Sequence, residues 1–240
     1  MQLYGYLLLF GSVLTGGLSF FLFKGADKNY LKLFLSFSGA FLFALSVLHL
    51  MPEVYSSPNK HIGAFILFGF FIQIVLEFFS EGIEHGHTHV HHDHLHAFPL
   101  AMILSLCLHS FLEGMPLAGA THIEGQPIDN SLLYGIVLHH LPVAFALVSM
   151  LIASGITRGR AVLFLCLFAI MGPLGAFTAS MLGTGALNLS AWYNEIMAVV
   201  IGIFLHISTT ILFESSSNHR FNLYKIAAIL TGGILGILAT

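Results

Sequence analysis

Residues 131–154 read SLLYGIVLHHLPVAFALVSMLIAS, a run of 24 residues without an Asp, Glu, Lys or Arg. A helix needs about 20 consecutive apolar residues to cross the hydrocarbon core of a bilayer. The run therefore predicts a transmembrane helix. It also carries three residues that are unusual at that depth, namely His139, His140 and Pro142.

The rest of the chain has the same apolar character. Of its 240 residues, 57% are hydrophobic and only 8% are charged, whereas about a quarter of the residues are charged in an average soluble protein. The lipid bilayer is the partner that makes such a composition stable. The net charge of −3 is small, and it gives no reason to expect a nucleic acid as a partner.

Further apolar runs, separated by polar or Gly-, Pro- and Asn-rich clusters, predict an all-α polytopic bundle of about eight transmembrane helices. The predicted spans are Leu3–Phe23, Leu33–Met51, Ile62–Phe79, Phe98–Ala120, Ser131–Ser154, Ala161–Leu182, Tyr193–Phe213 and Leu223–Ala239. The last span is short and rich in glycine. We expect residues 1–240 to form a single transmembrane domain, with a His-rich cytoplasmic loop at residues 80–97.

The basic residues predict the orientation, because Lys and Arg concentrate in cytoplasmic loops. With the N-terminus outside, the odd-numbered loops face the cytoplasm, and seven of the eight Lys and Arg side chains lie in or beside them. The seven are Lys24, Lys28, Lys32, Arg158, Arg160, Arg220 and Lys225. The even-numbered loops carry only Lys60. Both termini are therefore expected outside, and the plasma (inner) membrane is the expected location.

Ionisable groups inside a membrane are retained where they pair, bind ions or line a watery path. The densest set lies on the fourth and fifth predicted spans. His109 and Glu113 are four residues apart, so that they share one helix face. His139 and His140 are adjacent and point about 100° apart, so that one of them can face span four while the other faces a neighbouring helix or a second site.

Imidazole and carboxylate groups suit zinc, iron and similar ions better than calcium or copper(I). We therefore predict a metal site from His109, Glu113, His139 and His140. The alternative is that these histidines are core residues that form hydrogen bonds between helices.

Two prolines follow these residues closely. Pro116 and Pro142 lack an N–H group, and each frees a carbonyl one turn earlier. Discontinuous helices are tolerated at membrane depth where they are buried or line a cavity, and they commonly frame transport sites. The sequence therefore predicts that both helices are kinked or broken beside the metal site.

The loop after the third span reads EGIEHGHTHVHHDHLHAF over residues 81–98. It contains seven histidines: His85, His87, His89, His91, His92, His94 and His96. Flexible His-rich tracts bind zinc-like metals weakly and exchange them quickly, so this loop is expected to receive metal in the cytoplasm. A solvated linker with no specific role is the alternative.

Other polar residues flank the central cluster on both sides. His49 and Glu53 stand four residues apart at the outer end of span two and form the predicted entrance. Glu77 and Glu81 on span three lead toward the loop histidines and form the predicted cytoplasmic exit.

The order of these motifs resembles the ZIP (Zrt/Irt-like protein) family of divalent metal transporters. The motifs are HLMPE at 49–53, the His-rich loop, HSFLEG at 109–114 and HHLP at 139–142. The resemblance implies an eight-helix bundle in which the first and last three helices repeat one arrangement, with helices four and five at its centre. It also implies transport into the cytosol, with His109, Glu113 and His139 as ligands of the primary site.

Four positions depart from the family pattern. Ser110 stands where Asn is usual and His140 where an acidic residue is usual. Val143 replaces a His or Glu, and Gly172 replaces a Glu. Many family members hold two metals at this centre, so the resemblance implies that the secondary site is absent or much altered here. We expect one central metal bound by His109, Glu113 and His139, with His140 or water completing the coordination.

The leading hypothesis is a carrier whose transported substrate is Zn²⁺, with Fe²⁺, Mn²⁺ and Cd²⁺ as further candidates. One alternative is a membrane metal sensor or regulator that keeps the scaffold without transporting. Another is an intramembrane zinc hydrolase with Glu113 as the base, but no HExxH or GxSxG string is present. We therefore expect no enzyme and no catalytic residues. A homodimer is a further candidate arrangement.

Overall fold

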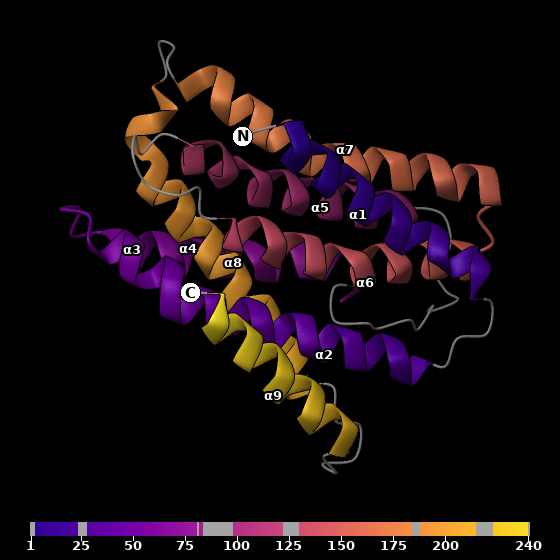
Figure 1. The fold of residues 1–240 in the computed structure, drawn as a ribbon. Coiled ribbons are helices and arrows are strands. Elements are labelled where there is room, and N and C mark those ends of the chain that lie inside the picture. Colours follow the sequence, from indigo (N-terminus) through magenta and orange to yellow (C-terminus); the bar gives the residue numbers. More distant parts are fainter. Residues whose placement is uncertain are drawn as a thin grey trace.

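The computed structural model describes residues 3–23, 28–80, 82–83, 98–121, 130–183, 188–214 and 223–239. Eight long helices make up the bundle within these residues: α1 (Leu3–Leu22), α2 (Lys28–Leu45), α4 (Ile62–Ser80), α5 (Phe98–Gly114), α6 (Ser131–Ala153), α7 (Arg158–Gly183), α8 (Tyr193–Glu214) and α9 (Leu223–Leu238) (Figure 1). Short helical segments extend three of them: η1 (Ser46–Leu50), α3 (Met51–Tyr55), η4 (Met115–Thr121) and η5 (Leu189–Trp192). No β-strand occurs in these ranges.

The predicted fold class is confirmed. In the described part of the chain, seven helices are long and apolar enough to cross a membrane. The eighth, α9, is apolar but has only 16 residues. Large side chains such as Phe71, Phe78 and Leu230 are exposed, as expected where lipid replaces water around a helix. The chain is an integral membrane protein.

The second span is longer than the sequence predicted. Its helix passes Pro52 and continues to Tyr55, although Pro52 has no N–H to donate and usually interrupts a helix. A π-helical turn at Ser46–Leu50 precedes the proline, and the N–H of Met51 donates to the carbonyl of Ser46, five residues back. This wider turn shifts the hydrogen-bond register immediately before Pro52, so the helix continues. Such π-turns are frequent at functional sites.

The strongest helix contacts form four pairs: α1 with α6, α2 with α9, α4 with α8, and α5 with α7. These four pairs show an internal symmetry. If α1 is exchanged with α7, α2 with α8, α4 with α9 and α5 with α6, the same set of four pairs results. This is the packing expected of a bundle whose first and last three spans repeat one arrangement. The beginning of α1 and the end of α9 lie on the same side, the left-hand side of Figure 1.

Glycines allow the backbones of these pairs to touch. In the α4–α8 pair, a Cβ added to Gly69 would lie 1.9 Å from the carbonyl oxygen of Val199, and one added to Gly202 would lie 1.9 Å from that of Ile66. Only glycine fits at such crossings, and small residues are how membrane helices approach closely. The crossing fixes α4 against α8 near the middle of both helices.

Helix α6 is the most enclosed of the long helices, with fifteen of its 23 residues buried. Helices α1, α2 and α7 all contact it. His139 and His140 are among the buried residues of α6, so both side chains face other helices rather than lipid.

Candidate metal centre

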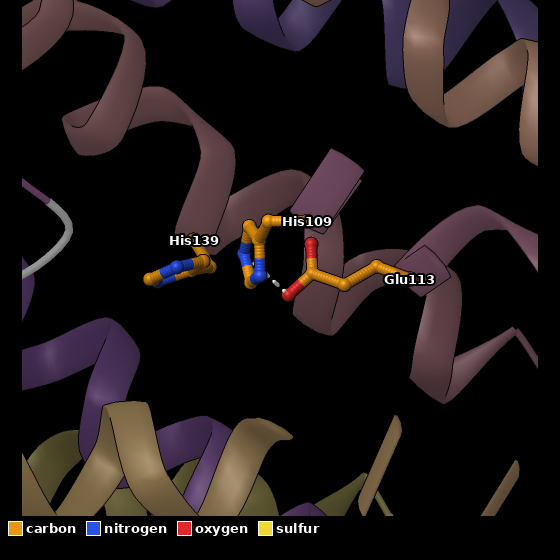
Figure 2. A group of neighbouring side chains, drawn as sticks. All are labelled: His109, Glu113 and His139. Carbon is orange, nitrogen blue, oxygen red and sulfur yellow. Dashed lines mark ion pairs between the residues drawn. The ribbon is translucent and has the colours of Figure 1, made fainter. Parts of the chain in front are cut away.

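The side chains of His109, Glu113 and His139 converge inside the bundle. His109 and Glu113 lie on the last turns of α5, and His139 lies near the middle of α6. All three are fully buried, with 0% of their surface exposed. Figure 2 shows the His109 ring and the Glu113 carboxylate facing each other, with the His139 ring beside His109.

Their geometry fits a metal ion. One ligand atom from each of the three residues lies within 4.8 Å of the other two. The Nε2 atom of His109 is 2.9 Å from Oε1 of Glu113 (Figure 2). Zinc binds nitrogen and oxygen at about 2.0–2.2 Å, so two tetrahedral ligands lie about 3.4 Å apart. A small inward movement of His139 would complete that arrangement.

His140 plays a different part from His139. Its Nε2 lies 2.9 Å from Oε2 of Glu113, and its side chain is almost completely buried. The Glu113 carboxylate thus has one oxygen beside His109 and the other beside His140. His140 is not part of the three-residue group that the structure brings within ligand distance.

Gln73 on α4 completes the surroundings of His109. Its Oε1 lies 3.2 Å from Nδ1 of His109, and the glutamine side chain is fully buried. Gln73 is not among the residues that the sequence predicts for the metal site. The available signal was an amide within the otherwise apolar run IGAFILFGFFIQIV at 62–75, but nothing in the sequence brings this run to α5.

The two prolines behave differently. On α5 the α-helix ends at Gly114 and continues as the 3₁₀ segment η4, which contains Pro116, so the expected discontinuity is present there. Helix α6 runs without interruption from Ser131 to Ala153 with Pro142 inside it. A break is therefore absent at Pro142, and the predicted kink there stays a prediction. α1 packs directly on this part of α6, with Gly16 in contact with the Leu141 carbonyl, and this packing supports the continuous helix.

The positions that depart from the family pattern lie together. A Cβ added to Gly172 on α7 would be 3.3 Å from Oγ of Ser110 and 3.8 Å from Cε1 of His140. Val143 is fully buried in an apolar cluster. The backbones of α5 and α7 touch at this level, because a Cβ on Gly114 would meet the Gly172 carbonyl oxygen at 2.1 Å. Packed helices thus occupy this space.

The predicted entrance residues His49 and Glu53 and the exit residue Glu77 do not belong to the group of three. His49 lies on η1 and Glu53 on α3, both partly buried. Glu77 on α4 is 3.3 Å from Nδ1 of His206 on α8, and the Phe70 ring is 4.9 Å from the His206 ring. Across the ranges described above, His109, Glu113 and His139 are the only group of three or more metal-ligating residues that comes together.

The remaining predicted residues lie outside the described residues. They are Glu81, His85, His87, His89, His91, His92, His94 and His96. The loop at 80–97 and its role therefore stay predictions.

Comparison with known proteins gives a consistent set of matches. The family model for the ZIP zinc transporter matches residues 84–239. Zinc transporter ZIP6 of Homo sapiens is 28% identical over 133 residues, which cover 53% of this chain and 17% of that protein. Zinc transporter ZIP9-B of Xenopus laevis is 25% identical over 120 residues, which cover 50% of this chain and 40% of that protein. The matched region thus spans less than half of either relative.

Proposed function

The chain belongs to the ZIP zinc transporter family, and we propose that it carries a divalent metal ion through the site of His109, Glu113 and His139, with zinc as the leading candidate. One observation carries this proposal. Three metal-ligating side chains from two helices meet in a fully buried position. Such groups are expensive inside a membrane and mark ion pathways there.

The donor set determines the coordination that we propose. Nε2 of His109, a carboxylate oxygen of Glu113 and one ring nitrogen of His139 supply three ligands. Zinc prefers four, and sites with three protein ligands leave one position for water or substrate. An open position suits a carrier, because the ion can exchange its waters for protein ligands one at a time. Fe²⁺, Mn²⁺ and Cd²⁺ accept similar donors and are the competitors to test.

We propose that this centre holds one ion and that His140 positions Glu113 rather than binding metal. The support is the 2.9 Å contact between Nε2 of His140 and Oε2 of Glu113. The neighbouring positions Gly172 and Val143 offer no ligand atom, and the helices are closely packed there. A second ion beside Glu113 would need donors that these positions do not supply.

The proposed route passes from outside along His49 and Glu53, through the central site, and past Glu77 toward the cytoplasm. Two observations support the direction. The bundle has its first and last helix ends on the same side (Figure 1), and seven of the eight basic residues lie in or beside the odd-numbered loops of the sequence. With basic loops in the cytoplasm, both termini lie outside and import delivers the ion to the loop at 80–97.

Flux measurements in liposomes test the proposal. Purified wild-type protein should take up radioactive zinc, and the His109→Ala and Glu113→Ala variants should not. His61→Ala is the matched control, because His61 is an exposed histidine at the start of α4 and should leave uptake unchanged. Full uptake by both site variants would refute the proposal. Zinc binding without flux in the wild type would instead indicate a sensor, the function that the altered positions around Gly172 also fit.

A further inference from the structure

His109 has a close neighbour at each of its two ring nitrogens. Nε2 lies 2.9 Å from Oε1 of Glu113 on the same helix, and Nδ1 lies 3.2 Å from Oε1 of Gln73 on α4. All three side chains have 0% exposure. No bulk water reaches this imidazole, so the protein atoms around it determine which nitrogen carries a hydrogen.

The structure turns Oε1 of the Gln73 amide toward Nδ1 of His109. In this orientation the amide oxygen accepts, so the donor is the Nδ1–H of His109. With the hydrogen on Nδ1, the nitrogen that can give its lone pair to a metal is Nε2. That is the nitrogen directed at Glu113 and the remaining ligands.

The position of Gln73 is fixed by contacts that do not involve His109. Oγ of Ser105 on α5 donates to the Leu76 carbonyl on α4 at 2.6 Å, which ties the two helices together one turn from the site. On its other side α4 crosses α8 at Gly69, where the backbones touch. Gln73 therefore meets His109 from a rigid support.

We propose that Gln73 is a positioning residue of the metal site, which holds the Nδ1–H of His109 and thereby presents Nε2 to the ion. The inference rests on the proposed function, since it assumes that His109 is a ligand. Metal-binding histidines are generally oriented by an oxygen acceptor at their second nitrogen, and loss of that acceptor lowers affinity by about 10–100-fold. Gln73 supplies this acceptor from a third helix.

Nitrogen NMR on the full-length protein tests the assignment directly. Histidines are labelled with ¹⁵N, and the His109 signals are identified by their loss in the His109→Gln variant. We expect Nδ1 to carry a hydrogen both without zinc and with zinc, and zinc to shift Nε2. If Nδ1 loses its hydrogen or becomes the zinc-bound nitrogen, the proposal is overturned. This readout does not depend on transport.

Two substitutions of Gln73 test the consequence for affinity. They are made in the full chain with the seven loop histidines replaced by serine, so that only the buried site binds zinc tightly. Gln73→Leu removes the acceptor and should raise the zinc dissociation constant about 10–100-fold. Gln73→Glu restores an oxygen acceptor and should bring the dissociation constant back to the wild-type value or below it, while slower release lowers the maximal flux.

Ser105→Ala is the matched control. It also removes a buried hydrogen bond between α4 and α5, but it leaves both Gln73 and the His109 ring in place, so the zinc affinity should fall by much less than in Gln73→Leu. An equal loss in Ser105→Ala and Gln73→Leu would mean that helix packing matters rather than the acceptor, and it would overturn the proposal. Thermal unfolding of each metal-free variant in detergent checks that the fold is retained.

Two different failures remain distinguishable. If His109→Ala binds zinc as tightly as the wild type, His109 is not a ligand and the proposed function fails. If His109→Ala loses zinc while Gln73→Leu keeps wild-type affinity, the metal site stands and only the role of Gln73 is refuted.

Discussion

Two imidazole–carboxylate contacts in this molecule use the same chemical groups in different surroundings. His109 and Glu113 lie 2.9 Å apart, and both side chains are 0% exposed. His206 and Glu77 lie 3.3 Å apart, and their side chains are 11% and 24% exposed. A fully buried pair needs further polar partners, because removing charge from water is costly.

The partners that each pair has found follow this difference. Around Glu113 the structure gathers His139 and His140 from α6, and around His109 it adds Gln73 from α4. Among the described residues, no third metal-ligating side chain comes close enough to Glu77 and His206 to form a group of three. Enclosure by several helices therefore distinguishes the proposed metal site from the polar pair of Glu77 and His206. The predictions that follow make matched changes in the two regions.

The largest effect is expected for Glu113→Gln. Structural zinc sites with about four ligands bind with roughly 10–16 kcal/mol, so one ligand contributes on the order of 2.5–4 kcal/mol. This corresponds to a loss of affinity of about 100-fold or more. Zinc uptake should fall to background in the liposome assay. Uptake above half of the wild-type rate would contradict the assignment of Glu113 as a ligand.

His139→Ala should follow closely. The variant removes the one ligand that comes from α6 and leaves His109 and Glu113 in place. We expect the dissociation constant to rise by about 100-fold, measured by competition with a chelator. An unchanged dissociation constant would mean that α5 alone holds the ion. It would contradict the assignment of His139 as a ligand.

A smaller change is expected for His140. His140→Leu removes the hydrogen bond to Oε2 of Glu113 without removing a ligand, so affinity should fall by about 10–100-fold while the stoichiometry stays at one ion. His140→Gln keeps an N–H donor and should lose less. A complete loss of the bound ion in both variants would show that His140 is itself a ligand.

The smallest effect is expected for Glu77→Gln, which repeats the Glu113→Gln change in the other region. A partly exposed pair contributes about 0–1 kcal/mol, so zinc affinity should change by less than about fivefold. The maximal rate should be affected more than the affinity, because Glu77 lies on the proposed exit route. If this variant binds zinc as poorly as Glu113→Gln, Glu77 matters for binding as much as Glu113 does. The proposed difference between the metal site and the pair of Glu77 and His206 is then wrong.

Much of the fold follows from the sequence, because long apolar runs leave few alternatives. The bounds of α6 and α8 agree with the predicted spans to within a residue. The error lies at the end of span two, which was predicted to end at Met51 and continues to Tyr55. A π-turn is a local adjustment of the backbone, and no residue pattern around His49 announces it.

Some features of the proposed site follow from the sequence, and others depend on packing between helices. The pairing of His109 with Glu113 follows from their spacing on one helix. The different roles of His139 and His140 depend on how α6 is rotated against α5, and this rotation is set mainly by packing against α1 and α2. The contact of Gln73 with His109 joins residues 36 positions apart, so spacing along the chain does not predict it.

The most direct test of the central claim is the number of zinc ions bound per chain. The protein carries serine in place of the seven loop histidines, and zinc is counted in detergent for this form and for the same form with His109→Ala. We predict one tightly bound zinc per chain in the first and none in the second. No bound zinc in the first, or an equal amount in both, would contradict the claim that His109, Glu113 and His139 form the metal site.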